Sequence, residues 1–469
     1  MASRIRGILA IGLKSSIFPD PMTQAPPAAP PSPTGAVNVR LGIMMFLEFF
    51  VWGAWYVTTG PYMATSGMAD QIGNAYSVGP IAAIISPFFL GLIADRFFSS
   101  ERVLGVMHLL GGLVMFLAPQ TAGWMFIGIL LLHMLFFMPT LGLTNTVAFH
   151  HIVNGQKVFP IIRVFGTIGW ILAGWTISLL AFDQSANQYY VAGAAAVVLG
   201  IYSFTLPHTA PPLRGERVTI GSVVGLDALR LFRSPSYAVF IAASLLICIP
   251  LALYYSFAAT FATASGAFNA GIDPATGEPI ARTGFYMSFG QVSEVVFMLA
   301  MPLFFARLGV KWMLAVGMAA WVLRYGLFAG AAESSTSVAY LLILGGILLH
   351  GICYVFFFVT GQIYTDEQSG PKIRGQAQGL LVLVTQGVGM LIGAQLGQRL
   401  FNRTVTGTEG WSTFWIYPAV MAAVVMVLFI LFFRQRRPEE DASMDRGFEV
   451  APADAARGPH EAGLPPVDR

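Results

Sequence analysis

The sequence predicts an all-α membrane protein whose twelve transmembrane helices form two six-helix halves. Three observations point to this fold class: an apolar composition, recurring apolar runs of membrane-spanning length, and one long polar interruption midway along the chain. Hydrophobic residues make up 56% of the 469 residues and charged residues 10%, whereas a soluble globular protein has about 25% charged residues. A soluble core does not need so much apolar surface, so we expect a polytopic membrane protein.

Apolar runs of about 18 or more residues can cross a bilayer as helices. Glycine, proline or charged residues separate such runs along this chain. In chain order the predicted spans are 41–64, 74–95, 103–120, 123–148, 159–181, 188–206, 237–263, 283–306, 311–331, 337–362, 374–400 and 412–434.

The longest polar interruption follows the sixth run and divides the chain into two halves. A Pro-rich stretch, "PPAAPPSPTG", comes before the first run and indicates a disordered extension. Both Met1 and Met22 are candidate translation starts. The expected organisation is an N-terminal extension (1–40), a first half (41–206), a cytoplasmic connector (207–236), a second half (237–434) and a disordered cytoplasmic tail (435–469).

Lysine and arginine gather in one set of loops, which the positive-inside rule places in the cytoplasm. That set comprises the loops around 96–102, 157, 214–233, 307–311, 372–374 and 434–437. The opposite loops hold only Arg282, Arg399 and Arg403. We therefore expect a multi-pass protein of the cell inner membrane, with both termini in the cytoplasm.

Two halves joined by a cytoplasmic loop are typical of a transporter with its site at their interface. The sequence has no GxxxxGK[ST] motif for an ATP-driven pump, no paired nucleophile and base, no metal cluster and no repeated filter of a channel. Cys248 and Cys353 lie in apolar runs, which excludes a disulfide framework. The net charge of +3 does not indicate nucleic-acid binding. We expect a carrier in the lipid bilayer that works as a monomer, with no enzymatic activity and no cofactor.

Four charged residues lie inside predicted spans: Glu48, Arg163, Glu294 and Arg324. Each costs about 2.5–3.5 kcal/mol at mid-helix on translocon scales, so each requires a reason. Arg163 is close enough to the cytoplasmic end to snorkel, and the two glutamates can pair with arginines that hold helices together. Arg324 is interpreted as structural, because no polar residue shares its helix face.

Helical spacing gives three of these residues partners, since residues three, four or seven apart share a face. Amides and carboxylates read donor–acceptor patterns, and aromatic rings stack on planar groups. The groups are Glu48 with Trp52 and Trp55 or Tyr56, Arg163 with Thr167 and Trp170, and Gln291 with Glu294.

This inventory suits a neutral, planar, hydrogen-bonding solute, and both a nucleoside and a sugar meet that description. Further polar side chains lie in the seventh, tenth and eleventh spans. The candidate substrate-binding residues are Arg163, Thr167, Trp170, Tyr255, Gln291, Glu294, Tyr354 and Gln386.

The loop "GLIADRFFSSERV" (91–103) lies between the second and third predicted spans. It resembles the loop signature of the major facilitator superfamily, with Gly91, Asp95 and Arg96 matching. An Asp beside an Arg at a helix end can lock or release neighbouring helices through a charge pair, so these three residues are candidates for conformational gating. An ordinary cluster of loop charges is the alternative.

Several stretches together resemble the nucleoside:proton symporter family of the major facilitator superfamily, over about 41–434. They are "WGAWYVTTGPYM", "FMPTLGLTNTVAF", "RVFGTIGW", "TLPH", "QVSE" and "RGQAQG". The resemblance implies a substrate pocket that includes Arg163, Thr167, Trp170, Gln291 and Glu294, with Trp170 in place of an expected phenylalanine.

The chain also departs from that family's pattern. Where nucleoside carriers of the family have Gln and Asn in the seventh span, this chain has Ala252 and Tyr255. Val355 stands where they have an Asp, and Glu48 stands where a Gln can occur. These departures concern the choice of nucleoside and the number of protons, which the sequence leaves open.

The expected activity is nucleoside import by proton symport and alternating access. Burial of a carboxylate disfavours its charged form and so allows it to take up a proton. Glu294 is expected to bind the solute, and Glu48 and Glu294 are the candidates for carrying the proton. The alternative is a proton-coupled or facilitative transporter of a sugar or another small polar solute on the same fold.

Overall fold

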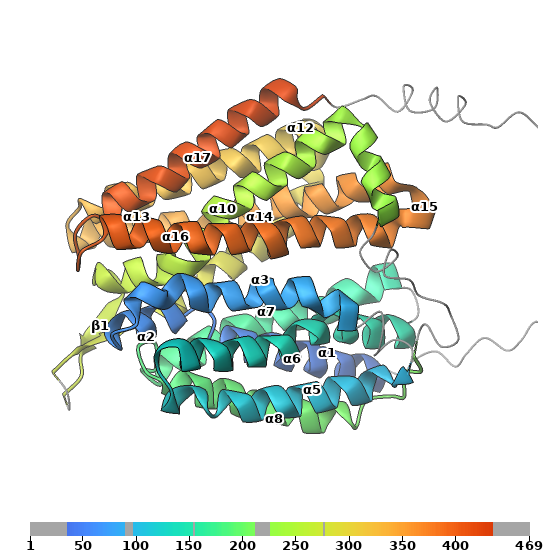
Figure 1. Ribbon diagram of the computed structural model, residues 1–469, viewed down its shortest axis with the longest axis horizontal. Helices are drawn as coiled ribbons and strands as arrows, with labels where there is room; N and C mark the ends of the chain where they lie inside the picture. Colours follow the sequence, from blue (N-terminus) through green and yellow to red (C-terminus); the bar gives the residue numbers. More distant parts are fainter. Residues whose placement is uncertain (1–34, 90–96, 153–154, 212–225, 275–276, 435–469) are drawn as a thin grey trace, which may run out of the picture.

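The computed structural model describes residues 35–89, 97–152, 155–211, 226–274 and 277–434, and most of these residues are helical (Figure 1). The segments η5 and η6 are π-helical, and the other η segments are 3₁₀ helices. In chain order the elements are α1 (Gly35–Gly53), α2 (Thr59–Thr65), η1 (Ala69–Gln71), α3 (Ile72–Phe89), α5 (Ser100–Met115), η3 (Ala118–Gln120), α6 (Gly123–His151), α7 (Gly155–Leu179), α8 (Asn187–Ser203), η4 (Leu226–Arg233), α10 (Pro235–Ala264), β1 (Asn269–Ile272), β2 (Pro279–Ala281), α11 (Thr283–Met287), α12 (Phe289–Ala332), α13 (Thr336–Leu348), α14 (His350–Tyr354), η5 (Val355–Val359), α15 (Thr360–Val382), η6 (Leu383–Gly389), α16 (Met390–Thr404) and α17 (Trp411–Phe432).

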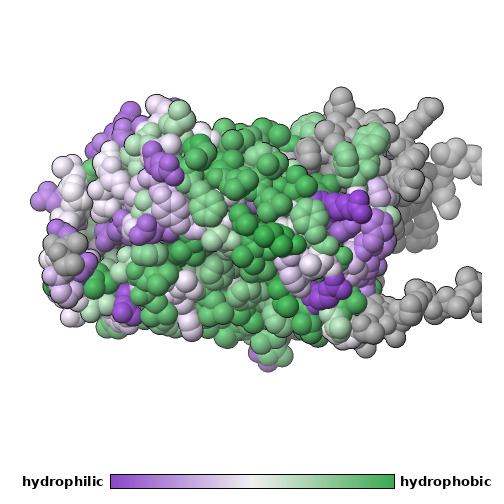
Figure 2. Space-filling view, turned by 90° about the horizontal axis from the view of Figure 1, so that it is seen from below, coloured by the Kyte–Doolittle hydropathy of each residue, from purple (hydrophilic) through white to green (hydrophobic). Residues whose placement is uncertain are grey.

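The outer surface of the helices is apolar. Figure 2 shows a broad hydrophobic band between two hydrophilic ends. Large side chains such as Leu299 (79% exposed) and Leu341 (66% exposed) point outward, which suits lipid as the solvent. Within the described ranges, nine helical stretches are long and apolar enough to cross a membrane. The expected helical membrane protein is confirmed in these terms.

Two places in the helix assignment need comparison with the predicted spans. The run 41–64 is interrupted at residues 54–58, between α1 and α2. Pro61, in the first turn of α2, lacks the N–H that a continuous helix would need there. The runs 283–306 and 311–331 are two helices under the single label α12, because the backbone is not helical at Gly309, which separates them. Gly309 has φ +63°, a left-handed conformation that glycine adopts without strain.

The helices form two packed groups, which are seen as two layers in Figure 1. In the first group α1 packs on α7, α5 on α6 and α8, and α3 on α6. In the second group α12 packs on α13, α14 and α17, and α10 on α16 and α17. The two groups meet where α3 contacts α16, α7 contacts α11 and α2 contacts α10.

The two ends of the molecule differ. One end, here called the hairpin end, carries the antiparallel pair β1–β2, a hairpin that the sequence analysis did not predict. The other, the connector end, carries η4, which packs on α15 (Figure 1). Both ends of the described chain lie there: the Tyr202 hydroxyl donates to the Arg40 carbonyl oxygen (3.1 Å), and the Ser236 hydroxyl to that of Arg434 (2.7 Å).

Glycine allows close helix contact between α10 and the η6–α16 segment of the second group. A Cβ atom at Gly393 would lie 2.6 Å from the Cβ of Ala252, and one at Gly389 would lie 2.8 Å from the Cβ of Cys248. Small residues let helix backbones approach in this way. Such close packing holds η6 and α16 against α10 and so fixes one wall of the cavity between the groups.

Candidate functional site

A cavity of about 760 Å³ lies between the two helix groups. The first group supplies side chains from α1, α7 and the turn after α1, and the second group from α10, α12, α14, η6 and α16. The lining residues are Phe49, Trp52, Tyr56, Arg163, Thr167, Trp170, Tyr255, Gln291, Glu294, His350, Tyr354, Gln386 and Met390.

All eight residues that the sequence proposed for substrate binding line this cavity. On α7 the spacing of Arg163, Thr167 and Trp170 places a cation, a hydroxyl and an indole on one helix face. On α12 Gln291 and Glu294 do the same for an amide and a carboxylate. The structure thus brings together residues that lie more than 200 positions apart in the chain.

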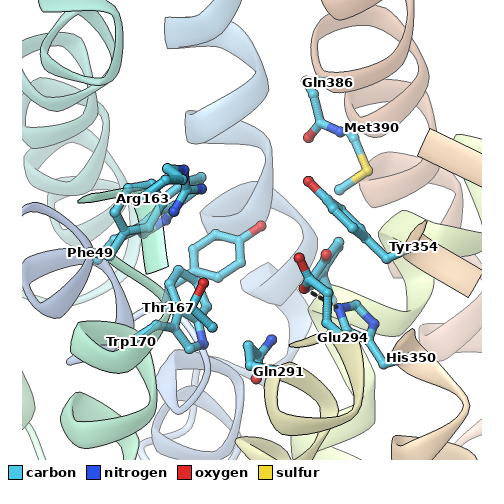
Figure 3. A pocket seen from close by; sticks show the side chains of 13 residues that line it. Phe49, Arg163, Thr167, Trp170, Gln291, Glu294, His350, Tyr354, Gln386 and Met390 are labelled. Carbon is cyan, nitrogen blue, oxygen red and sulfur yellow. Dashed lines mark ion pairs between the residues drawn. The ribbon is translucent and has the colours of Figure 1, made fainter. Parts of the chain in front are cut away.

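The cavity has two chemically different walls (Figure 3). The α7 wall holds Arg163, whose guanidinium lies 4.0 Å from the centre of the Phe49 ring, a cation–π contact. The opposite wall holds Glu294, His350 and Tyr354. A solute between the walls would meet a cation on one side and a carboxylate on the other.

Aromatic rings form the floor between these walls. Trp52 and Trp170 meet edge to face, with ring centroids 5.4 Å apart. Tyr56 meets Tyr255 in the same way at 6.1 Å and thereby links the two helix groups. Rings arranged edge to face hold one another in position, so this floor is a fixed surface for a planar solute.

His350 is the polar lining residue that sequence reasoning missed. Its ring stacks on Tyr254 (5.9 Å, 19°), and its Nε2 lies 3.9 Å from Oε2 of Glu294. Its Nδ1 is buried and has no hydrogen-bond partner among the described residues. The signal was present in the sequence, because His350 precedes Tyr354 by four residues and so shares its helix face.

The cavity continues toward the connector end. A second hollow of about 1,030 Å³ shares Trp52, Tyr56, Gln386 and Met390 with it. That hollow is further lined by Pro87 near the end of α3 and by other residues of α3 and α6. At the hairpin end, by contrast, α3 and α16 are joined by hydrogen bonds from Gln395 Nε2 to Asn74 and Ser77. The cavity therefore extends toward the connector end, whereas these hydrogen bonds hold the hairpin end together.

A family model described as "Nucleoside H+ symporter" matches residues 36–438. The chain belongs to this family of transporters. The resemblance inferred from the sequence motifs is confirmed, and so is the expectation of a transporter in place of an enzyme. Within the described residues, no group of three or more His, Cys, Asp or Glu is placed to hold a metal ion.

Among its relatives, YegT of Escherichia coli K12 is 40% identical over 415 residues (85% of this chain, 94% of YegT). The nucleoside permease NupG of the same organism is 32% identical over 409 residues (85% and 96%). The xanthosine permease of that organism is 32% identical over 413 residues (86% and 98%).

Solved structures agree with the observed fold. The crystal structure of NupG matches with a TM-score of 0.76 at 30% identity and covers 85% of this chain and 100% of that chain. A peptide transporter matches with a TM-score of 0.66 at 15% identity, covering 89% and 96%. The second likeness concerns the fold alone.

Glu48, the candidate proton carrier of the symporter, lies outside the cavity. It is fully buried in the first helix group, with Oε2 2.7 Å from Nε2 of His108 and Oε1 accepting a hydrogen bond from Thr140 (2.6 Å). The ring of Phe137 contacts both His108 and the lining residue Trp52. One aromatic layer therefore separates this carboxylate from the cavity.

Other charged candidates have different surroundings. Arg324 is fully buried; its Nε donates to the Gly346 carbonyl oxygen (3.0 Å), and its guanidinium lies 4.2 Å from the centre of the Tyr254 ring. It does not line the cavity. The gating candidates Gly91, Asp95 and Arg96 lie outside the described residues.

The residues that depart from the family's pattern lie in different surroundings. Tyr255 lines the cavity, whereas Ala252 packs against Gly393 and Val355 is buried among apolar side chains at the start of η5. Val355 thus offers no polar group to a solute.

Proposed function

We propose that this protein imports nucleosides across the inner membrane by proton symport and alternating access. The observation that carries the proposal is the cavity in which Arg163, Thr167 and Trp170 face Gln291 and Glu294. A neutral planar base would stack on the aromatic floor, and the hydroxyl groups of a ribose would pair with carboxylate and amide groups. The names of the relatives NupG and xanthosine permease support a nucleoside as the solute.

In this proposal twelve spans form two six-helix halves, and both termini lie in the cytoplasm. The connector end carries Arg230, Arg233 and Arg374, while the hairpin end carries Arg282 and Arg403. Together with the arginines outside the described residues, this bias supports a cytoplasmic connector end. The described state is then inward-facing, and a single chain contains the whole pathway, so it works as a monomer.

The roles of the lining residues follow from their chemistry. Trp170 and Tyr255, which both line the cavity, offer ring surface to the base. Gln291, Gln386 and Tyr354 both donate and accept hydrogen bonds, so they can read the edges of the solute. Glu294 accepts hydrogen bonds from hydroxyl groups, while Arg163 on the facing wall supplies donors.

Proton coupling is assigned to two carboxylates, Glu294 in the cavity and Glu48 beside it. A proton that crosses 100 mV supplies about 2.3 kcal/mol, enough for roughly 50-fold accumulation of a neutral solute. Val355 removes the family's usual acidic group from the tenth span, so the coupling falls to these carboxylates. Gly91, Asp95 and Arg96 are proposed to gate the cytoplasmic side.

The test is uptake of radiolabelled uridine and adenosine into proteoliposomes, with and without an acidic exterior. We expect the acidic exterior to stimulate uptake in the wild type, and Glu294→Gln to abolish it. The matched control is Glu333→Gln, since Glu333 is exposed beyond the end of α12 and its loss should leave uptake unchanged.

Alternative outcomes are distinguishable in the same experiment. Uptake that ignores pH, with normal counterflow, would contradict symport and indicate a facilitator. Absence of nucleoside uptake by well-folded protein, with competition by an unlabelled sugar in a binding assay, would support the sugar alternative, because sugars also prefer aromatic faces and carboxylates.

A further inference from the structure

A cluster of hydrogen bonds joins the two helix groups at the hairpin end, where α7 meets α11. Asp183 lies in the loop between α7 and α8, and its Oδ1 accepts hydrogen bonds from the Gly284 backbone N–H (2.6 Å) and the Ser178 hydroxyl (2.9 Å). The Ser178 oxygen in turn accepts from the Phe285 N–H (2.8 Å). One carboxylate and one hydroxyl thus hold the first turn of α11 against the end of α7.

The backbones at this junction are in close contact. A Cβ atom at Gly174 would lie 2.8 Å from the carbonyl oxygen of Gly284. The indole of the next residue, Trp175, donates to the hydroxyl of Ser288, which lies one turn after Gly284 (2.9 Å). The cavity lies on the inner side of this junction, since Trp170 and Gln291 line it from the same two chain segments. Opening the hairpin end requires α7 and α11 to separate, which breaks the hydrogen bonds to Asp183.

The carboxylate of Asp183 is only half satisfied in this closed arrangement. The residue is 1% exposed, and its Oδ2 is buried without a hydrogen-bond partner among the described residues. A proton on Oδ2 would remove the buried charge and leave Oδ1 free to accept from Gly284 and Ser178. The closed junction is therefore compatible with the neutral acid.

The charged groups around Asp183 come from the second helix group. Arg282 precedes α11, and Asp273 and Glu278 of the β1–β2 hairpin line the same small surface hollow as Asp183. The two acidic groups oppose a negative charge on Asp183, while Arg282 favours it. Ser178 from α7 is uncharged.

We propose that Asp183 is a proton-binding gate residue, which takes up a proton as the hairpin end closes and returns it to the same side when that end opens. This inference goes beyond the proposed function, because it holds for any transported solute. It rests on the proposed orientation only in that the hairpin end then faces the outside of the cell.

The direction of the pH effect follows from burial. Desolvation raises the pKa of Asp183 from 3.8 to about 6, although the hydrogen bonds from Gly284 and Ser178 and the charge of Arg282 lower it. When the junction opens, the carboxyl group meets water and its pKa returns toward the ordinary value. Protons bind more tightly to the closed form, so they favour closure; this stabilisation is present below about pH 4 and is lost as the pH rises through about 6.

For a proton symporter this sign is useful. An acidic exterior would help the outer face to close after the solute enters, before the inner face opens. In the inward-facing state Asp183 stays buried at the far end from the opening, so its proton is not delivered to the cytoplasm. Asp183 therefore adjusts the rate of the cycle and not the number of protons transported.

The test is a distance measurement by pulsed electron paramagnetic resonance on the full chain in lipid nanodiscs. Spin labels on Thr65→Cys and Arg403→Cys report the separation of the groups at the hairpin end, since both positions are exposed and the natural Cys248 and Cys353 are buried. Between pH 7.5 and pH 4.5 we expect the ratio of closed to open molecules to rise more than about tenfold in the wild type.

Two variants identify the group responsible. Asp183→Asn imitates the neutral acid, so we expect it to stay closed and to lose the pH dependence. Ser178→Ala removes a hydrogen bond that favours the ionised carboxylate, so we expect the midpoint of the transition to move to higher pH. The control Gln398→Ala weakens the α3–α16 contact, where Gln398 accepts from the Gly73 N–H, and should open the end without changing the pH dependence.

A wild-type distance that does not change with pH would overturn the proposal, as would a full pH response in Asp183→Asn. If Asp183→Asn fails to fold, an unchanged midpoint in Ser178→Ala would overturn it equally. None of these outcomes depends on nucleoside uptake, so a failure here is distinct from a failure of the proposed function.

Discussion

Glu294 Oε2 lies 3.9 Å from Nε2 of His350, and both atoms border the cavity between the helix groups. This separation is too long for a direct hydrogen bond, although it permits an ion pair when the imidazole is protonated. The pair is one of the polar contacts that a bound solute would rearrange. A small movement of α12 toward α14 would join the two groups directly.

His350→Phe removes the imidazole but keeps a ring that can stack on Tyr254. In the solute-bound form, movement of α12 toward α14 would join His350 and Glu294 by a hydrogen bond. A hydrogen bond to a charged group contributes about 1.5–3 kcal/mol, so we expect its loss to raise the KM for uridine about tenfold or more. His350→Gln keeps a polar group beside Glu294 and should lose less. Uptake kinetics in proteoliposomes would measure both, with His150→Gln as the control because His150 is exposed. Equal kinetics for His350→Phe and wild type would exclude His350 from the site.

Trp170 is expected to supply the principal aromatic surface for a base. Aromatic contacts contribute about 0.5–1.5 kcal/mol beyond the area that they bury, so Trp170→Ala should weaken nucleoside binding by roughly tenfold, whereas Trp170→Phe should change it only a few-fold. Binding measured by calorimetry in detergent separates this from effects on transport. A loss of equal size in both variants would mean that the indole N–H is what the solute requires.

The sequence predicted the cavity lining well because helical spacing fixes which side chains share a face. Arg163, Thr167 and Trp170 fall on one stripe of α7 whatever the rest of the chain does. Spacing alone does not say which stripe of a neighbouring helix faces them, and family resemblance supplied that pairing. The clearest miss was His350, a single histidine in an apolar run, for which the one available signal is its position four residues before Tyr354.

Glu48 illustrates the opposite limit. It shares a helix face with Trp52, and Trp52 lines the cavity, yet the carboxylate turns to His108 and Thr140 on α5 and α6. One face of α1 is wide enough for Trp52 to line the cavity while Glu48 packs against the neighbouring helices. Only the packing of α5 and α6, which depends on contacts far apart in the sequence, decides which of them a side chain meets.

The next prediction concerns Arg324, whose buried charge has few hydrogen-bond partners. Nη1 and Nη2 have no hydrogen-bond partner among the described residues, and replacing a buried charge by an apolar side chain is often neutral or stabilising. We expect Arg324→Met to keep or raise the thermal unfolding temperature but to slow uptake about tenfold, since Tyr254 lies between Arg324 and His350.

Arg324→Ala serves as the matched comparison, because it leaves a cavity as well as removing the charge. Large-to-small changes in a core cost about 2–5 kcal/mol, so this variant should unfold at a lower temperature than Arg324→Met. If the two variants lose the same stability, the guanidinium itself holds the helices together, and the structural interpretation of Arg324 is correct.

The buried pair of Glu48 and His108 gives the last prediction. In Glu48→Gln the side chain still fills the same space and can still bond Thr140, but it can no longer take up a proton. If Glu48 carries the coupling proton, the variant loses accumulation driven by an acidic exterior and retains counterflow, which needs no net proton movement. We expect this result from paired uptake and counterflow assays in proteoliposomes.

Thr140→Val is the control: it removes a hydrogen bond to Glu48 but not the carboxylate, so it should lower stability by about 1–3 kcal/mol and keep gradient-driven accumulation. Gradient-driven accumulation that survives in Glu48→Gln would leave Glu294 to bind both the solute and the proton.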